Sequence, residues 1–378
     1  MANAATNPAS APAIPFFIAS RKQTRQAFTP ATATLGSTAV SLSPIEVPAT
    51  GYLESIRLEV TGTWSGGGAG TAFNADAPFN AISSIGVRSA DGTPIITPIT
   101  GYQLYLINKY GGMVYAGATA DPKNAYGYSA TGGTATGTFK FFLSLPFEFD
   151  RQTGLGSIPA LASNRSYVID VTLNTIGNIF GATNTPTGAT LNIIGYSEYW
   201  AQPAAANSVG QAQQTTPQGL GTLNRWQLET PVVTAGAKYV KSNNVGGTIR
   251  NHIITLRTSA GARTDSDFPA LTQLYVDNEP QYYLTSTYWT DMMSRIFGYS
   301  GTTKDAAGAL DTGVYVIPYN LLLSGGYSDS ADNSRGQFLN TNSATLLQFY
   351  GASFGASANT LEILTSTVSG TASNIYSK

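Results

Sequence analysis

Hydrophobic and polar residues alternate with a period of two through most of this chain, most clearly from Lys140 to Asp150. Counting from Phe139, one parity carries Phe139, Phe141, Leu143, Leu145, Phe147 and Phe149, and the other carries Lys140, Phe142, Ser144, Pro146, Glu148 and Asp150. Successive side chains of a β-strand point to opposite faces. The pattern therefore predicts a strand with one face in a core and the other face mostly in water.

A weaker copy of this strand occurs late in the chain, from Val314 to Leu321. Pro146 interrupts the first stretch as Pro318 interrupts the second, each between a large aliphatic residue and an aromatic one. A proline lacks the backbone donor of a sheet ladder and belongs at an edge or a bulge. Two strands interrupted in the same way suggest that one domain plan is used twice.

Other elements recur in the same order in both halves. In the first half the pattern predicts strands at 53–61, 82–88, 167–173 and 191–200, a turn at 90–92, and a helix at 100–110 that Thr100 caps and Gly111-Gly112 ends. In the second half, strands around 254–256, 274–276 and 360–363 take the corresponding places. A helix again precedes the proline-containing strand: Ser286 or Thr287 can cap it, Trp289, Met292, Met293 and Ile296 form one stripe, and Gly298 ends it.

Each half thus contains seven or eight short strands and one embedded helix, which is typical of an eight-stranded jelly roll made of two packed sheets. The predicted fold class is all-β, with two tandem jelly rolls that each carry a short inserted helix. The one clear shift in composition lies at 201–222 and predicts a linker. The predicted divisions are an N-terminal arm (1–34), a first jelly roll (35–200), the linker (201–222) and a second jelly roll (223–378).

Composition narrows the possible functions. The 378 residues include no cysteine and one histidine, and the net charge is −1. Disulfides and thiolate metal sites are excluded, and nothing predicts sequence-specific nucleic-acid binding. Charged residues make up 11%, against about 25% in typical soluble domains. Sparse charge suits a secreted β-rich protein, and it equally suits a protein packed against many copies of itself.

The N-terminal arm combines apolar and basic residues. Ile14, Phe16, Phe17 and Ile18 precede Arg21, Lys22 and Arg25, the reverse of the order in a secretory signal, and no apolar run is long enough to span a bilayer. One interpretation is a flexible tail with solubilising charges. The sequence favours the other, an arm that docks on a membrane or a neighbouring subunit, because exposed Phe-Phe-Ile is costly unless covered. The residues predicted to face that surface are Phe16, Phe17, Arg21, Lys22 and Arg25.

The sequence predicts no catalytic site, no cofactor site and no metal site. His252 is interpreted as a hydrogen-bonded strand histidine, and the glycine-rich loop at 66–70 lacks the Gly-Lys-Ser/Thr ending of a phosphate loop. Glu148 and Asp150 are interpreted as the wet face of their strand rather than as glycosidase carboxylates. The acidic loop of Asp329, Asp332 and Asn333 lacks EF-hand spacing and is interpreted as a polar turn.

The plan as a whole resembles the double jelly-roll major capsid proteins, and within them those of tailless icosahedral phages with an internal membrane, the tectivirus-like group. The local likeness is best over 51–61, over 82–88 with Asp91-Gly92, and over 101–108. The resemblance implies a homotrimer that forms a pseudo-hexagonal capsomer of the virion shell and is assembled in the host cytoplasm. It also implies contacts with neighbouring capsomers, with penton and minor capsid proteins and, through the arm, with internal membrane lipid. It implies no catalysis and no cofactor.

Three rival functions remain open at this point. A secreted or virion-surface carbohydrate-binding β-sandwich would use the 21 tyrosines of the chain. A glycoside hydrolase would need acidic pairs that converge in a cleft. A phage spike or fibre would need a long fibrous repeat, which the sequence does not show.

Overall fold

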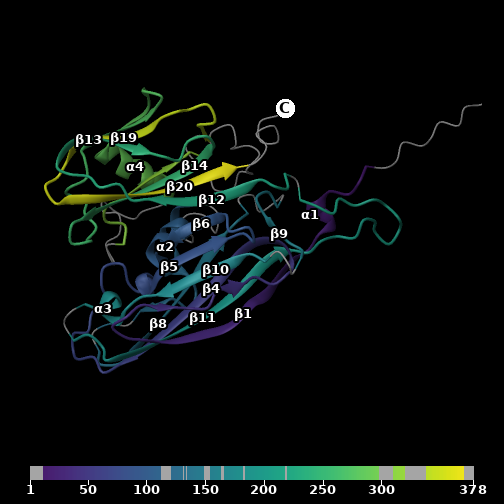
Figure 1. Ribbon diagram of the computed structural model, residues 1–378, viewed down its shortest axis with the longest axis horizontal. Helices are drawn as coiled ribbons and strands as arrows, with labels where there is room; N and C mark the ends of the chain where they lie inside the picture. The colour runs from purple at the N-terminus through teal and green to yellow at the C-terminus, as the bar shows by residue number, and fades with distance from the viewer. Residues whose placement is uncertain are drawn as a thin grey trace, which may run out of the picture.

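The chain folds into two β-barrels in contact, shown in the computed structural model of Figure 1. The structure describes residues 12–111, 121–130, 132, 134–148, 154–162, 166–181, 184–217, 219–297, 310–319 and 338–369. The first barrel runs from purple to teal and the second from green to yellow (Figure 1).

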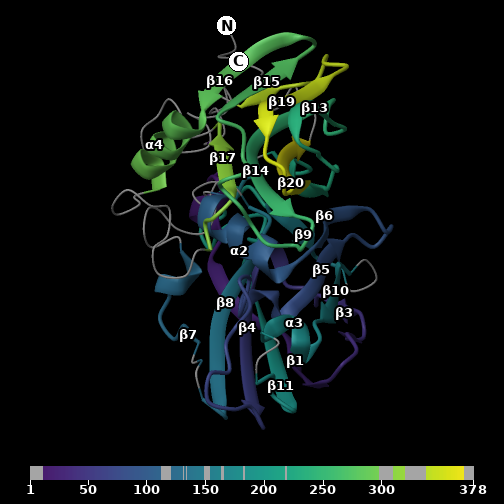
Figure 2. The same cartoon turned by 90° about the vertical axis from the view of Figure 1, so that its left-hand side faces the viewer.

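The first barrel consists of two antiparallel sheets. One has the order β1 (Lys22–Leu35), β11 (Gly188–Trp200), β4 (Gly51–Ser65), β8 (Gly137–Pro146), with the short strands β7 (Ser129–Ala130) and β9 (Ile158–Ala160) attached to β8 and β4. The other has the order β6 (Pro94–Ile99), β5 (Ile82–Arg88), β10 (Val168–Leu173), with β2 (Val40–Ser41) and β3 (Ile45–Glu46) both on β10. Figure 2 shows β4, β8 and β11 as one layer and β5 and β10 as the other.

The second barrel repeats this plan. One sheet runs β12 (Leu223–Glu229), β20 (Ala358–Ser369), β14 (Thr248–Thr258), β17 (Val314–Pro318), with β18 (Leu339–Asn340) on β14. The other runs β13 (Gly236–Ser242), β19 (Leu347–Phe354), β15 (Leu271–Val276), β16 (Glu279–Thr285).

Strand pairing makes the two barrels equivalent element by element. The order β1-β11-β4-β8 corresponds to β12-β20-β14-β17, and β2/β3-β10-β5-β6 corresponds to β13-β19-β15-β16. A helix follows the β5–β6 hairpin in the first barrel and the β15–β16 hairpin in the second. The predicted all-β fold of two tandem jelly rolls, each with an inserted helix, is confirmed.

The two inserted helices begin with side-chain caps. Thr100 caps α2 (Gly101–Tyr110) in a capping box with Gln103, and Gly111 follows the last turn, as predicted. At the start of α4 (Ser286–Phe297), the hydroxyl oxygen of Thr285 accepts from the backbone N–H of Tyr288 at 3.2 Å. The predicted caps, Ser286 and Thr287, were therefore one or two residues too late. Gly298 lies outside the described residues. The other helical turns among the described residues are α1 (Phe16–Ala19), α3 (Ile176–Ile179), η1 (Phe79–Ala81) and η3 (Pro122–Asn124).

Strand β8 has the predicted buried face: Phe139, Phe141, Leu143, Leu145 and Phe147 are all at most 1% exposed. The prolines also lie as predicted. Pro146 and Pro318 are the last residues of β8 and β17; among the described residues, β8 pairs there with β4 alone and β17 with β14 alone. The missing N–H therefore breaks no ladder.

The predicted wet face of that stretch is wrong from Ser144 onward, because Ser144 and Pro146 are buried and Glu148 is 2% exposed. Its carboxylate accepts a hydrogen bond from the Trp200 indole at 2.8 Å, so a partner distant in sequence makes the burial possible. Phe149 and Asp150 lie outside the described residues, as do Asp329, Asp332 and Asn333.

The predicted arm ends too late, because Lys22–Leu35 is strand β1 and pairs with β11 along its whole length. The sequence of β1 does not show the pattern expected of a strand. Most side chains from 21 to 26 are exposed, so the strand lacks an alternating apolar face there. Its register also shifts twice, between Gln26 and Ala31, around the exposed Thr29. An edge strand with bulges gives little periodic signal. Residues 22–34 belong to the first barrel.

Candidate functional site: the N-terminal segment and the seam between the barrels

The part of the chain that the structure describes contains no group of three His, Asp or Glu side chains placed to hold a metal ion. Among the same residues, no helix is long and apolar enough to cross a membrane. His252 on β14 is fully buried, with Nδ1 2.8 Å from the Tyr319 hydroxyl oxygen. Burial lowers the pKa of His252 from 6.5 to about 3. The interpretation of His252 as a hydrogen-bonded strand residue agrees with this position on β14.

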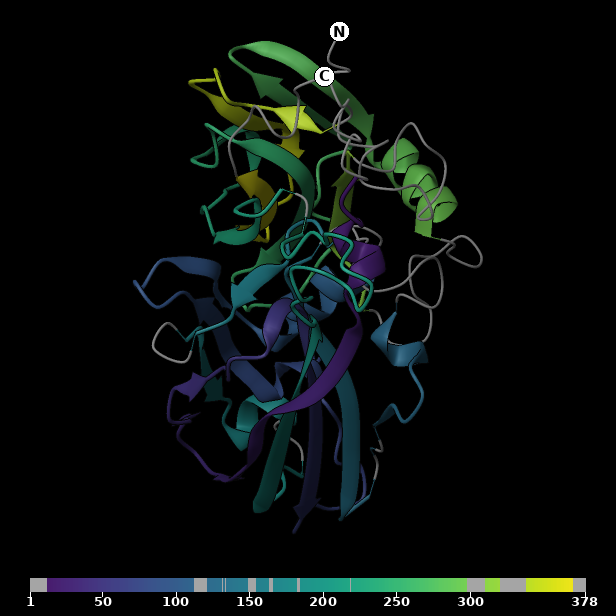
Figure 3. The same cartoon turned by 90° about the vertical axis from the view of Figure 1, so that its right-hand side faces the viewer.

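Phe16 packs on the body of its own chain. Its ring meets Tyr52 edge-on at 5.4 Å between ring centroids and lies 5.9 Å from Trp200, and these three side chains form a small apolar cluster. The backbone around it is held as well, because Ile14 exchanges hydrogen bonds with the loop at Ala212 and Gln214. Figure 3 shows α1 (purple) beside that loop (teal). Phe16 is therefore covered within the chain.

Lys22 is also engaged within the chain. Its Nζ lies 2.8 Å from Glu54, 3.9 Å from Glu148 and 4.5 Å from the centroid of the Trp200 ring. Because Glu148 is buried, the half-exposed ammonium of Lys22 supplies part of its compensation. Lys22 fixes the start of β1 on the first barrel.

The remaining predicted arm residues stay on the surface. Phe17 is 48% exposed, and its neighbour Ile18 is 63% exposed. Arg21 and Arg25 are exposed at the start of β1. Of the five residues predicted to face a membrane or a neighbour, the structure thus buries Phe16, ties Lys22 to Glu54, and leaves Phe17, Arg21 and Arg25 accessible.

The seam between the barrels is a continuous structural joint. Strand β12 of the second barrel pairs in parallel with β6 of the first at Trp226 and Ile96, so one ten-stranded sheet crosses from barrel to barrel. Trp226 is fully buried, and the Leu228 N–H donates to the Thr97 hydroxyl at 3.1 Å. Helix α2 lies at the same joint (Figure 2), and its last turn accepts hydrogen bonds from Arg250 and Asn251 of β14.

A buried ionic cluster lies at the end of α2. Lys109 Nζ is 3.0 and 2.8 Å from the two carboxylate oxygens of Asp311, which belongs to the second barrel, and 2.8 Å from Asp121. The Tyr110 hydroxyl donates to the same Asp311 carboxylate. Burial alone would lower the pKa of Lys109, but Asp311 and Asp121 together raise it. Lys109 therefore contacts one acid near its own helix, Asp121, and one acid of the second barrel, Asp311.

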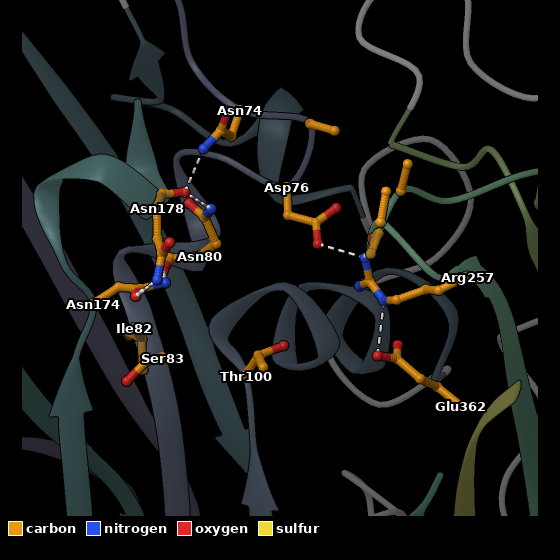
Figure 4. Close-up of a pocket in the computed structure, with 14 residues that line it drawn as sticks. Asn74, Asp76, Asn80, Ile82, Ser83, Thr100, Asn174, Asn178, Arg257 and Glu362 are labelled. Atoms are coloured by element: carbon orange, nitrogen blue, oxygen red, sulfur yellow. Dashed lines mark hydrogen bonds and ion pairs between the residues drawn. The ribbon is translucent and has the colours of Figure 1, made fainter. Parts of the chain in front are cut away.

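A second ionic network crosses the seam at Asp76, with Arg257 on one side and Arg263 on the other. One Asp76 oxygen lies 2.9 Å from Arg257 and the other lies 2.8 Å from Arg263. Arg257 also pairs with Glu362 at 2.7 Å, so it lies between two carboxylates (Figure 4). Burial alone would lower the pKa of Arg257, but Glu362 and Asp76 raise it above its ordinary value.

This network borders a cavity of about 700 Å³ between the barrels. Its first-barrel wall carries four asparagines, Asn74, Asn80, Asn174 and Asn178. They bond mainly to one another's backbone and side chains; for example, Asn74 and Asn80 both donate to the Asn178 carbonyl at 2.8 Å. The wall is thus held mainly by its own hydrogen bonds, although the side-chain oxygen of Asn80 is buried without a hydrogen-bond partner.

The residues of these two ionic networks were not predicted from the sequence. Lys109 could have been recognised as unusual from the sequence. It lies near Ile107 and Tyr110 in a predicted helix, in a chain with few charged residues. Asp76, Arg263 and Asp311 carry no such signal. Each lies in a loop of polar and small residues, where a charged side chain is ordinary.

Comparison with known proteins supports the architecture. No protein-family model matches the sequence. No curated protein matches it. Among solved structures, the major capsid protein of Sulfolobus turreted icosahedral virus matches with a TM-score of 0.62, 11% identity, and coverage of 94% of this chain and 99% of that one. The capsid of the virus PBCV-1 matches with a TM-score of 0.60, 11% identity, and coverage of 92% and 93%. The major capsid protein P2 from bacteriophage PM2 matches with a TM-score of 0.51, 11% identity, and coverage of 93% and 99%.

This chain has a double jelly-roll fold. The likeness extends over nearly the whole of each protein, so both barrels and their joint contribute to it. At 11% identity it concerns the arrangement of the backbone. The resemblance stated from the sequence is thus confirmed for the fold.

Proposed function

We propose that this chain is the major capsid protein of an icosahedral virion and acts as a structural protein without catalysis. The observation that carries the proposal is the pair of topologically equivalent barrels fixed to each other across a buried seam. Three such chains around a three-fold axis present six similar barrels, so a trimer can occupy a position of six-fold character in a shell. The similar structures are those of capsid proteins, which supports this use of the shape.

A rigid seam is what such a role requires. If the barrels could rotate against each other, the outline of the trimer would vary and a regular facet could not form. Here one sheet crosses the joint, and two buried ionic networks cross it as well. Buried networks of this kind break at a cost of several kcal/mol and favour a single arrangement.

The purified protein is expected to be a trimer, with three times the chain mass of 39.6 kDa. Light scattering after size exclusion measures this mass, and electron microscopy of the same fraction should show particles with a hexagonal outline built of six similar densities. A stable monomer at micromolar concentration that forms no ordered particles would contradict the proposal.

The exposed part of the N-terminal segment is proposed to contact a neighbouring capsomer or internal membrane lipid. Replacing both Phe17 and Ile18 by serine should leave the trimer intact, because neither side chain is buried in the chain, and should lower the yield of assembled particles at least several-fold. Particle yield by sedimentation measures the effect. Val232→Ser, at an aliphatic residue of the second barrel that is 72% exposed, is the matched control. Equal yields from all three proteins would remove this role.

None of the similar structures reported above is described as a carbohydrate-binding protein. No feature of the described residues specifically favours that alternative, and the capsid role is the one we retain.

A further inference from the structure

The cluster at the end of α2 contains the groups that form an amide bond. A primary amine, Lys109 Nζ, lies against the carboxylate of Asp311, and a second carboxylate, Asp121, lies 2.8 Å from the same nitrogen. Lys109 is 9% exposed and Asp311 is fully buried. The Nζ of Lys109 also lies 5.7 and 5.4 Å from the ring centroids of Tyr105 and Tyr110, so aromatic rings line the site.

The separation of amine and carboxyl is that of reacting atoms. Nζ is nearly equidistant from both oxygens of Asp311, at 3.0 and 2.8 Å. The carbon that joins those oxygens must then lie no farther from Nζ than roughly 3–3.5 Å, the separation found in near-attack conformations. Because both groups are held on packed elements, the reaction would be intramolecular and free of the entropy cost of an encounter.

We infer that Lys109 and Asp311 form an isopeptide bond that ties the two barrels together. Lys109 Nζ bonds to Cγ of Asp311, the bond from Cγ to Oδ2 breaks, and one molecule of water leaves. Nothing is oxidised or reduced. Transfer of one proton from Nζ to the Asp311 carboxylate, along the existing hydrogen bond, converts the ion pair into the amine and acid that react. Because Asp311 and Asp121 raise the pKa of Lys109, the neutral pair is the less populated form, and amide formation consumes it as it forms.

Asp121 and Tyr110 have distinct tasks in this reaction. Asp121, in contact with Nζ, takes the proton that the nitrogen loses on attack and delivers it to the departing Oδ2. The Tyr110 hydroxyl donates to Oδ1 of Asp311, the oxygen that carries negative charge in the tetrahedral intermediate and stays as the amide carbonyl. Burial favours the amide over its hydrolysis, because water has little access to the closed site.

The isopeptide bond would link the two barrels covalently. The chain has no cysteine, so no disulfide can join the barrels. Residue 109 lies in the last turn of the helix of the first barrel, and residue 311 precedes β17 of the second. The link would close a loop of about 200 residues, a length at which a cross-link restricts the unfolded chain strongly.

Intact mass spectrometry of the denatured full-length protein tests the inference. We expect the wild type to be lighter by one water than its Lys109→Arg variant, after allowance for the substitution, because arginine cannot form the bond. A tryptic digest should contain one branched peptide that joins the segments around residues 109 and 311, with no cleavage after Lys109. Lys140→Arg, at a surface lysine paired with Glu59, is the matched control and should retain the water loss.

The Asp121→Asn variant tests the proposed proton transfer. It keeps both reacting groups and a similar shape, and it should remain mostly at the unlinked mass. Wild-type protein at the unlinked mass, yielding linear peptides that contain Lys109 and Asp311, would overturn the inference. A water loss that persists in Lys109→Arg would show dehydration of an aspartate instead, and would overturn it equally. Complete linkage in Asp121→Asn would refute the role of Asp121.

Discussion

Replacing Arg263 by alanine is expected to lower the free energy of unfolding by about 3–5 kcal/mol, the usual loss when one partner of a buried ion pair is removed. The Arg263 side chain is 2% exposed. It donates to Asp76 at 2.8 Å, to the Ala75 carbonyl at 2.8 Å and to the Thr312 carbonyl at 3.2 Å. Its guanidinium also lies 4.7 Å from the centroid of the Tyr102 ring. The variant would remove this donor from two partly buried hydrogen bonds to carbonyls and from one oxygen of Asp76. Unfolding in urea, followed by tryptophan fluorescence, measures the change.

Two further variants test whether the loss of stability comes from the hydrogen bonds of Arg263. Arg263→Lys keeps the charge but loses the planar fork that reaches three acceptors, so it should recover only part of the stability. Arg295→Ala removes an arginine that is 62% exposed and paired with Asp291 on the surface of α4, and it should change the free energy of unfolding by no more than about 0.5 kcal/mol. Equal effects of Arg263→Ala and Arg295→Ala would show that the Asp76 network contributes nothing to the seam.

Acidification from pH 6.5 towards pH 3 is expected to destabilise the protein through His252 by about 1.4 kcal/mol per pH unit, about 4–5 kcal/mol in all. The pKa of His252 is about 3 in the folded chain, below its ordinary value of 6.5 in an unfolded one. Between these two values the unfolded state binds a proton that the folded state does not. Stability therefore rises with pH across this window, and the effect is absent above it.

The variant His252→Asn isolates this contribution, because asparagine cannot titrate and can still offer a polar atom to Tyr319. Urea unfolding at several pH values from 7 to 4 gives one stability curve for each protein, and the difference between the curves removes the contribution of the carboxylates. We expect the wild-type curve to be steeper by the amount given above. Since His252 is the only histidine, no other imidazole can produce the difference. Parallel curves would contradict a buried neutral histidine.

The sequence predicted the barrels best where local and tertiary requirements agree. Over residues 139–143 of β8 and residues 58–64 of β4, buried and more exposed residues alternate, because one face of the sheet lies in the core and burial of one face gives a period of two. The ends of α2 were predicted from Thr100 and Gly111, because a threonine hydroxyl can accept from the first free N–H groups of a helix and glycine is a common residue at a helix end. The edge strand β1 and the burial of Glu148 were not predicted, since neither leaves such a periodic pattern.

The candidate site was predicted less well. Phe16 and Phe17 are adjacent and chemically identical, yet one is buried on Tyr52 and Trp200 and the other is exposed. A pattern of residue types cannot separate them, because the distinction depends on which side chain meets a surface built by β4 and β11.

By itself, the sequence determined the all-β class, the two-fold repetition of the barrel and the absence of thiol chemistry, because periodicity, element order and composition are properties of the chain read in order. Only the tertiary structure decided which charged residues meet across the seam. Lys109 and Asp311, and likewise Asp76 and Arg263, lie about 200 residues apart in sequence. Their pairing follows from how the first barrel is set against the second, and no local pattern encodes that arrangement.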